Sequence, residues 1–321
     1  MPTDISNILT HEYQLGEIAS ITRLKSGVSN ENYKVVVDNG QYVVRVCHFE
    51  PQNQIKTMIP FLEYAETTGY PAPRLVRTKT GAAYFGPETE PVVVTTLVPG
   101  QAATDTDINE NKLASLGASL ANFHKINWSP VLSPKTTNTT YILNVYTQFV
   151  DADIMPSDEV RQFMHILAED YAYFSAAETQ VLFDSLPQGL IHNDVIPGNV
   201  LFDDDVVTSF VDLEEVGRGI MLLDIARVLN SWCFVNNQPA ELRFAAFLRS
   251  YEENRPFTTD EIAMITKAMH FIGFRNSVYG LKMLAQRRIE CISNIRSYEN
   301  LKFVRGNYGR LENLVQAVLT R

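Results

Sequence analysis

The sequence predicts an α+β fold with two lobes: a small β-rich N-terminal lobe and a large helical C-terminal lobe with an embedded hairpin. The length of 321 residues is enough for two hydrophobic cores. Strand signals gather in the first hundred residues, and apolar residues at helical spacing dominate after Pro99. We therefore expect a β-rich lobe at residues 1–97 and a helical lobe at residues 98–321.

The β-rich lobe is predicted from short apolar runs and from the turn residues between them. Residues 5–20 predict a short helix that leads into the first strand, and residues 54–68 predict a second helix that ends at Gly69. Asn39-Gly40 is typical of a type I′ hairpin turn. Three runs rich in β-branched and aromatic residues predict strands: Tyr33–Val37, Tyr42–Val46 and Val92–Leu97.

The remainder of the chain is mostly helical by pattern. Residues 129–140 are rich in Ser, Thr, Pro and Asn, which favours a loop, and residues 141–183 predict two helices. Thr258 and Glu261 form a capping-box pattern at the start of a late helix. Four apolar residues at helical spacing define the buried face of the first helix after Pro99: Leu113, Leu116, Leu120 and Phe123.

One segment carries a catalytic motif. His192 to Asn199 has the spacing H-x-D-x-x-x-x-N, and Asp212 follows thirteen residues later, as in a kinase catalytic loop and its metal-binding aspartate. Phosphoryl transfer requires a group that orients the attacking hydroxyl and oxygen ligands for Mg²⁺. We assign the first role to Asp194 and the metal to Asn199 and Asp212. The alternative is a surface turn beside an unrelated aspartate at a strand end.

The flanks of this motif predict how its side chains meet. Short strands are predicted on both sides of the loop, at Leu190-Ile191, Val200–Phe202 and Thr208–Val211, with a turn at Asp203–Asp205. A loop followed by a hairpin brings the three motif side chains to one edge. We expect the nucleotide in the crevice between the two lobes.

Several residues of the β-rich lobe are candidates for binding the nucleotide. In the loop Ser26–Asn32, the side chains of Ser29 and Asn30 and the backbone N–H groups are placed to hold phosphate oxygens, although an ordinary polar turn has the same composition. Arg45 stands alone in an apolar strand and faces either the phosphates or solvent. Backbone groups near Thr96 and Val98 are expected to meet the adenine.

The polar residues around the motif have predicted supporting roles. We expect His192 to brace the loop by hydrogen bonding rather than to act as a base. Asp224, an acid among apolar residues, is expected to accept hydrogen bonds from backbone N–H groups of the loop. His124 is expected to be structural. The helix acid that kinases pair with their phosphate-binding cation is not assigned. Glu63 and Glu66 lie on the predicted helix, but a solvated surface acid is the favoured interpretation of each.

Composition restricts the class of partner. The net charge of −10 argues against broad binding to nucleic acid or to an anionic membrane. The three cysteines form no C-x-x-C pair, no run of apolar residues reaches membrane-spanning length, and residues 1–13 lack the pattern of a secretory signal. These features favour the reducing cytoplasm. The catalytic motif predicts a small-molecule hydroxyl substrate. No pattern specifies an oligomeric state.

Over roughly residues 20–285 the sequence resembles the aminoglycoside phosphotransferase/choline kinase superfamily. The segments that carry this resemblance are Leu97–Gly100, Leu116–His124, Leu190–Phe202, Val211–Glu214 and Leu223–Ala226. The resemblance implies a protein-kinase-like fold with ATP and Mg²⁺. Within the superfamily, four segments are similar to the phosphotransferase-type homoserine kinases: Ser185–His192, Leu229–Phe234, Tyr251–Thr258 and Arg275–Tyr279. Gly198 and the Asp-x-Glu form of Asp212–Glu214 depart from the homoserine kinase pattern.

Three hypotheses follow. The first is an ATP-dependent kinase of a small hydroxylated metabolite, with homoserine as the leading acceptor. Arg275 and Trp232 are then candidates for the acceptor pocket, with a helix-surface arginine and a core tryptophan as alternatives. The second is a kinase of choline-like, aminoglycoside or other amino-alcohol acceptors, in which acids such as Glu214 surround the cation. The third is a kinase-like protein that binds nucleotide without transfer.

Overall fold

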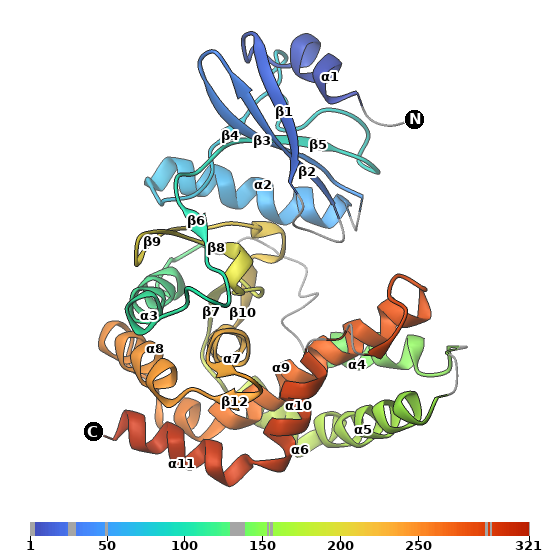
Figure 1. The fold of residues 1–321 in the computed structure, drawn as a ribbon, viewed down its shortest axis with the longest axis vertical. Coiled ribbons are helices and arrows are strands. Elements are labelled where there is room, and N and C mark those ends of the chain that lie inside the picture. The colour runs from blue at the N-terminus through green and yellow to red at the C-terminus, as the bar shows by residue number, and fades with distance from the viewer. Residues whose placement is uncertain are drawn as a thin grey trace. The chain divides into compact units, whose positions relative to one another are not determined.

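The chain forms two compact units, which are each described separately. The computed structural model describes residues 4–24, 30–48, 51–128, 139–152, 154, 157–292, 295 and 297–320. The first unit comprises Met1–Ala103 and Gly198–Val216, and the second comprises Thr104–Pro197 and Gly217–Arg321. Figure 1 shows a sheet with helices in the first unit and a mostly helical second unit, which is the predicted α+β class.

A five-stranded antiparallel sheet forms the first unit, with strand order β1-β2-β3-β5-β4. Its core consists of alternate valines of the central strands, including Val35, Val44 and Val94, packed with Ile5 and Leu9 of the first helix. The strands are β1 (Ile18–Leu24), β2 (Glu31–Val37), β3 (Gly40–Val46), β4 (Leu75–Val76) and β5 (Val92–Thr96), and the helices are α1 (Ile5–Glu12) and α2 (Pro51–Thr68).

The predicted hairpin belongs by its contacts to this first unit. It consists of β8 (Val200–Asp203) and β9 (Val206–Phe210), and β6 (Gln101–Ala102) pairs with β8 in a second sheet of order β6-β8-β9. A short 3₁₀ helix, η2 (Leu213–Glu215), follows and contacts α2. This division differs from the predicted lobes at 1–97 and 98–321. The hairpin follows β6 by about a hundred residues in the sequence, but β8 pairs with β6, and this pairing makes the hairpin part of the first unit.

Two local predictions in the first unit are wrong. The β2–β3 turn is not type I′, since neither Asn39 nor Gly40 has a positive φ angle. Val37 pairs with Gly40, and the N–H of Asp38 donates to Glu17 O at 3.3 Å, so the turn is held by the lead-in to β1. The first helix also ends at Glu12 rather than extending to residue 20. By contrast, α2 ends before Gly69, whose φ of 73° fits a left-handed helix terminus.

The second unit is a set of helices around a two-stranded ribbon of β7 (Gln188–Ile191) and β10 (Gly217–Ile220). Its longest helix, α9 (Thr259–Ala285), begins at the predicted capping box and is buried along most of its length. The other helices are α3 (Glu110–His124), α4 (Thr139–Phe149), α5 (Asp158–Ser175), α6 (Ala177–Asp184), α7 (Met221–Trp232), α8 (Glu241–Asn254), α10 (Ser297–Gly306) and α11 (Tyr308–Leu319). The remaining short elements are η1 (Pro197–Asn199), β11 (Phe234–Val235) and β12 (Gln238–Pro239).

Residues 141–183 contain parts of three helices rather than the predicted two. Ala176 has an extended backbone (φ −62°, ψ 135°), which separates α5 from α6 without a Gly or Pro to mark the break. The predicted face of α3 is confirmed, since Leu113, Leu116 and Leu120 are fully buried. Most of the loop predicted at 129–140 lies outside the described residues.

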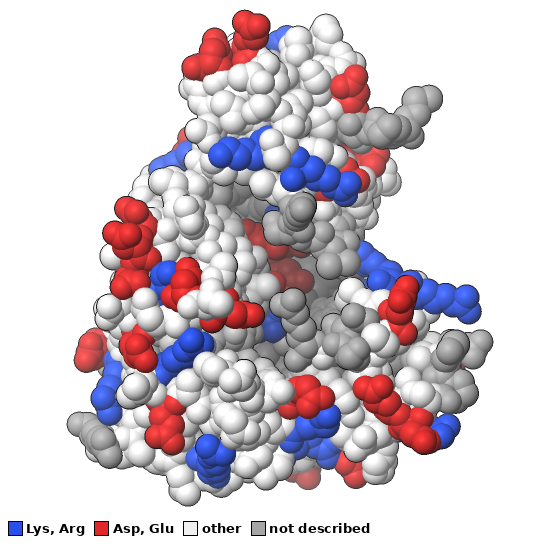
Figure 2. All heavy atoms as spheres, viewed as in Figure 1, with Lys and Arg blue, Asp and Glu red and all other residues white. Residues whose placement is uncertain are grey.

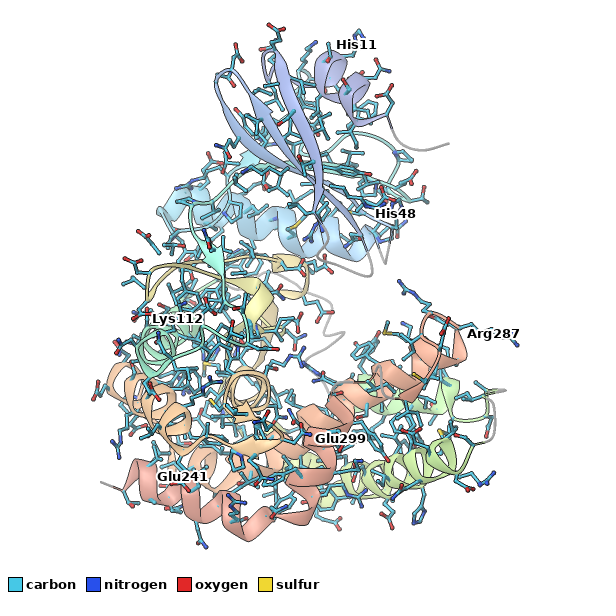
Figure 3. The ribbon with its side chains drawn as sticks, in the orientation of Figure 1. His11, His48, Lys112, Glu241, Arg287 and Glu299 are labelled. Carbon is cyan, nitrogen blue, oxygen red and sulfur yellow. The ribbon has the colours of Figure 1, made fainter. Side chains whose placement is uncertain are left out.

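The surface of the second unit carries charges of both signs. On the face shown in Figure 2, acidic and basic side chains are intermixed over its helices. Some form exposed pairs of small energetic value, as Lys302 does with Glu299 (labelled in Figure 3) at 2.6 Å. No helix in the described ranges combines the length and apolar character needed to span a bilayer.

Candidate active site

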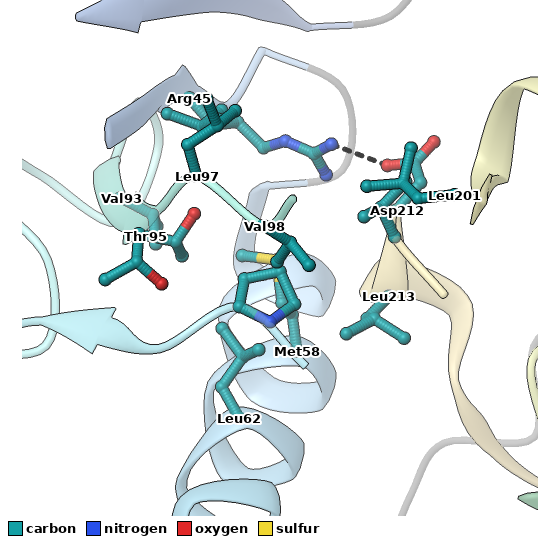
Figure 4. A pocket seen from close by; sticks show the side chains of 14 residues that line it. Arg45, Met58, Leu62, Val93, Thr95, Leu97, Val98, Leu201, Asp212 and Leu213 are labelled. Carbon is teal, nitrogen blue, oxygen red and sulfur yellow. Dashed lines mark hydrogen bonds and ion pairs between the residues drawn. The ribbon is translucent and has the colours of Figure 1, made fainter. Parts of the chain in front are cut away.

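The first unit contains an apolar pocket of about 600 Å³, part of it open to solvent. It lies where the sheet, α2 and the hairpin meet, and Figure 4 shows Met58 and Leu62 of α2 opposite the strands. The lining residues are mainly aliphatic: Val43, Val93, Thr95, Thr96, Leu97, Val98, Pro73, Leu201, Val211 and Leu213, with Arg45 and Asp212 as the charged members. Thr96 and Val98, predicted to lie beside the adenine, are both part of this wall. The mainly aliphatic lining suits a flat, largely apolar ring system.

Arg45 binds two carboxylates beside this pocket. Its Nη2 donates to Asp212 Oδ1 at 2.6 Å, as the dashed line in Figure 4 marks. Its Nη1 donates to Glu214 Oε2 at 2.5 Å, and its Nε donates to Asn32 Oδ1 at 3.0 Å. Burial disfavours the charged guanidinium, but Asp212 and Glu214 outweigh it, so the pKa of Arg45 lies above its usual range. Arg45 therefore faces the pocket and its acids rather than solvent.

Glu214 is the carboxylate partner that the sequence did not identify for Arg45. It comes from η2, whereas the candidates were on α2; there, Glu63 pairs with Arg77 instead. Burial and the neighbouring Asp212 raise the pKa of Glu214 to about 8, against the opposing effect of Arg45. One guanidinium thus serves two acids, which leaves this region short of positive charge.

The predicted phosphate loop is only partly described. Asn30 donates from Nδ2 to Glu214 Oε2 at 3.1 Å, and its Oδ1 accepts from the N–H of His48 at 3.0 Å. In this structure the amide therefore joins β3 to η2. Ser29 lies outside the described residues.

The hairpin places the two predicted metal ligands at the same end. The carbonyl of Asn199 accepts from Val211 N–H at 2.9 Å, and Val200 lies opposite Phe210 in the β8–β9 ladder. Asp212 follows directly in a left-handed conformation (φ 63°, ψ 52°), which is uncommon for a residue other than glycine and turns the chain into η2. A carboxylate oxygen and an amide oxygen form a donor set that fits Mg²⁺, because this hard cation prefers oxygen ligands.

Asp194 belongs to the second unit and is held by an arginine there. Its Oδ1 accepts from Arg227 Nε at 3.1 Å and from Arg227 Nη2 at 2.7 Å. Burial alone would raise the pKa of Asp194, but Arg227 above all, with smaller effects of Arg275 and His192, holds that pKa below its usual range. The carboxylate is therefore ionised at neutral pH and suited to accept a hydrogen bond from a hydroxyl.

Asp224 fastens the backbone of the same loop, as expected from the sequence. Its Oδ2 accepts from His192 N–H and its Oδ1 from Asn193 N–H, both at 2.7 Å. His124 Nε2 lies 3.2 Å from Asp224 Oδ2, and His124 Nδ1 lies 2.7 Å from the Tyr251 hydroxyl. Burial lowers the pKa of His124, so the ring is neutral. Its Nε2–H then donates to the carboxylate, and its Nδ1 accepts from Tyr251.

Three further predicted residues contact the loop. His192 Nδ1 accepts from Asp194 N–H at 3.3 Å, which fits the bracing role expected for this histidine. Arg275 is 4% exposed, and its two terminal nitrogens donate to the side-chain and backbone oxygens of Asn193. Trp232 is fully buried, and its indole N–H donates to Val195 O at 3.0 Å. These contacts favour the core alternative for Trp232 and a loop-holding role for Arg275.

Arg227 is the residue of this region that sequence reasoning missed. A signal was available, because Asp224 and Arg227 are three residues apart on α7 and therefore lie on one helix face. Once Asp224 is placed at the catalytic loop, Arg227 is expected nearby.

The fold, the pocket with its arginine-paired acids and the braced aspartate loop together define a kinase-like phosphotransferase. The comparisons identify the family. The sequence pattern of the phosphotransferase enzyme family matches residues 20–259, and the chain belongs to this family. It is accordingly a phosphotransferase that acts on an alcohol group.

Relatives with an assigned activity are similar over most of their length. The homoserine kinase of Methylobacillus flagellatus is 28% identical over 255 residues, covering 78% of this chain and 76% of that protein. The homoserine kinase of Pseudomonas aeruginosa strain LESB58 is 26% identical over 253 residues, with 78% and 76% coverage.

Two solved structures share the fold at low sequence identity. An amicoumacin kinase in complex with AMP-PNP, Ca²⁺ and Ami has a TM-score of 0.66 at 17% identity, covering 97% of this chain and 93% of that chain. A choline kinase from Streptococcus pneumoniae has a TM-score of 0.65 at 15% identity, with 94% and 96% coverage.

Proposed function

We propose that the protein transfers the γ-phosphoryl group of ATP to the hydroxyl of a small metabolite, with homoserine as the acceptor. The observation that carries the proposal is the ionised carboxylate of Asp194, held on a loop whose backbone is fastened by Asp224. Similarity to homoserine kinases over more than three quarters of the chain supports the choice of acceptor.

The first unit binds the donor in this proposal. The apolar pocket takes the adenine, with backbone groups near Thr96 and Val98 as hydrogen-bonding partners. Arg45 neutralises phosphate charge through a fork that matches two oxygens. Asn199 and Asp212 hold Mg²⁺, which when bound neutralises charge on the phosphate oxygens. Glu214 acts through Arg45 as an orienting partner rather than as a contact for the acceptor.

Asp194 acts on the acceptor. Its carboxylate accepts a hydrogen bond from the acceptor hydroxyl and orients an oxygen lone pair towards the γ-phosphorus. It takes the proton late in transfer, because phosphoryl transfer passes through a loose transition state in which the nucleophile needs little activation. The products are ADP and a phosphate monoester.

A panel of acceptors tests the proposal. Release of ADP from Mg·ATP is measured with homoserine, choline, ethanolamine, 3-amino-1-propanol and an aminoglycoside. The proposal expects turnover of homoserine at a kcat/KM at least tenfold above any other member. Turnover confined to amines without a carboxylate would instead establish an amino-alcohol kinase. Nucleotide binding without transfer to any member would overturn the choice of homoserine as the acceptor.

A further inference from the structure

The Arg227 guanidinium has binding capacity that its contacts with Asp194 do not use. Nε and Nη2 both donate to the same oxygen, Asp194 Oδ1. Within the described parts of the chain, Arg227 Nη1 makes no hydrogen bond. The Arg227 side chain is 17% exposed and that of Asp194 is 31% exposed, so solvent reaches both members of the pair. A small ligand can therefore reach both side chains.

The position of the loop does not depend on Arg227. Asp224 holds two of its backbone N–H groups, and Arg275 holds Asn193 through both terminal nitrogens. Trp232 donates to the carbonyl of Val195, on the other side of Asp194 in the chain. The loop thus has fixed contacts at His192, Asn193 and Val195 besides the Asp194–Arg227 pair.

The charge around Asp194 is unlike that around Asp212. Two guanidiniums act on the Asp194 carboxylate, those of Arg227 and Arg275. Arg275 is nearly inaccessible and committed to Asn193, and the Asp224 carboxylate is fully buried and bonded to N–H groups and His124. Arg227 is therefore the accessible cation of this group. An acceptor whose hydroxyl reaches Asp194 places its other groups within a few ångströms of that cation.

We propose that Arg227 binds a carboxylate of the acceptor and thereby selects hydroxy acids over amino alcohols that lack a carboxylate. The inference rests on the proposed function, because it assumes that the acceptor hydroxyl meets Asp194. A guanidinium fork matches a carboxylate in geometry, and Nη1 with the outer N–H of Nη2 offers such a fork. The acceptor carries its hydroxyl and carboxylate on one short carbon skeleton, since Asp194 and Arg227 are in direct contact.

The test compares two acceptors that differ by one group. Homoserine and 3-amino-1-propanol share the hydroxyl, the amine and the carbon chain between them, and homoserine alone has the carboxylate. In Arg227→Met, kcat/KM for homoserine is expected to fall about 10- to 100-fold, mainly through KM, as for loss of a hydrogen bond between charged groups. The value for 3-amino-1-propanol is expected to stay within about threefold or to rise, because a repelling cation is removed.

Two further variants separate charge from geometry and from folding. Arg227→Lys keeps the charge without the fork and is expected to lie between the parent and Arg227→Met. Arg218→Met on β10 removes an exposed arginine of the same unit and is expected to match the parent with both acceptors. An equal loss for homoserine and 3-amino-1-propanol in both Arg227 variants would overturn the proposal, since Arg227 would then act only through Asp194.

A binding measurement separates this inference from the proposed function. L-2-Aminobutyrate has the carboxylate and amine of homoserine but no hydroxyl, and calorimetry without ATP reports its affinity. We expect binding at least tenfold weaker in Arg227→Met than in the parent. If the parent fails to phosphorylate homoserine yet shows this difference, the acceptor assignment fails while the role of Arg227 stands. If homoserine is phosphorylated but both proteins bind L-2-aminobutyrate equally, the role of Arg227 fails alone.

Discussion

Each unit pairs one aspartate of the predicted motif with an arginine, but the balance of charge differs between them. In the first unit, Arg45 serves both Asp212 and Glu214, so two acids share one cation. In the second unit, Arg227 and Arg275 both act on Asp194. Two acidic groups that share one cation suit a metal-loaded phosphate, and an accessible guanidinium suits an anionic group of the acceptor. Under the proposed function, the first unit therefore receives the donor and the second unit receives the acceptor.

The largest effect on activity is expected from replacing Asp212 in the first unit. Asp212→Asn removes the negative charge of a predicted metal ligand. It also removes the ion pair between this residue and Arg45 Nη2. We expect kcat to fall about 1,000-fold or more, because metal and cation positioning supply most of the catalysis in phosphoryl transfer. The Mg²⁺ concentration for half-maximal activity should rise as well. Steady-state kinetics across a Mg²⁺ titration measure both quantities.

Asp204→Asn is the matched control for this variant. Asp204 also has a left-handed backbone (φ 50°), lies in the turn of the same hairpin and is exposed. It should keep the parent activity. Equal kcat in Asp212→Asn and Asp204→Asn would contradict the proposed role of Asp212 as a metal ligand.

A smaller effect is expected from removing the shared cation of the first unit. Arg45→Met leaves Asp212 and Glu214 facing each other and takes away the predicted phosphate contact. We expect the KM for ATP to rise about 10- to 100-fold while the KM for the acceptor changes little. Arg23→Met on β1, where the side chain is 64% exposed, is the control. A larger change in the acceptor KM than in the ATP KM would reverse the assignment of the two units.

The smallest effect is expected from Tyr251 in the second unit, which is linked to the catalytic loop only through His124 and Asp224. Tyr251→Phe leaves the buried Nδ1 of His124 without its hydroxyl donor. The cost should be about 1–3 kcal/mol of unfolding free energy, seen as a fall of several degrees in Tm. Turnover should fall only a few-fold, since Asp224 keeps both of its loop N–H contacts. Thermal unfolding and kcat together check this, with Tyr173→Phe on α5 as an exposed control. An unchanged Tm would show that the His124–Tyr251 bond does not stabilise the fold.

The two regions also differ in how far the sequence could predict them. Around Asp194 the partners are close in the chain: Asp224 is 31 residues from Asn193, and Arg227 is 33 residues from Asp194. Motif spacing and an acid among apolar residues were enough to predict the Asp224 contacts. Around Asp212, Arg45 is 167 residues away, and its second acid comes from a short 3₁₀ helix without its own sequence pattern.

Local sequence patterns gave wrong predictions where contacts with distant segments determine the backbone conformation. Asn39-Gly40 favoured a type I′ turn, but neither residue has a positive φ angle. The turn is instead held by the hydrogen bond from Asp38 N–H to Glu17 O, just before β1. Periodicity likewise gave no sign of the extended Ala176 that divides α5 from α6. The hairpin was found from its own residues, but its place in the first unit depends on pairing with Gln101-Ala102. Such pairings bring together segments that no local window contains.

The most direct test of the account is a paired measurement on Asp194→Ala. The central claim is that Asp194 acts on the acceptor hydroxyl, whereas nucleotide affinity depends on the first unit. The account predicts that turnover of homoserine falls about 1,000-fold or more, while the dissociation constant for Mg·ATP, measured by calorimetry, stays within about threefold of the parent. Parent-level turnover in the variant would contradict it.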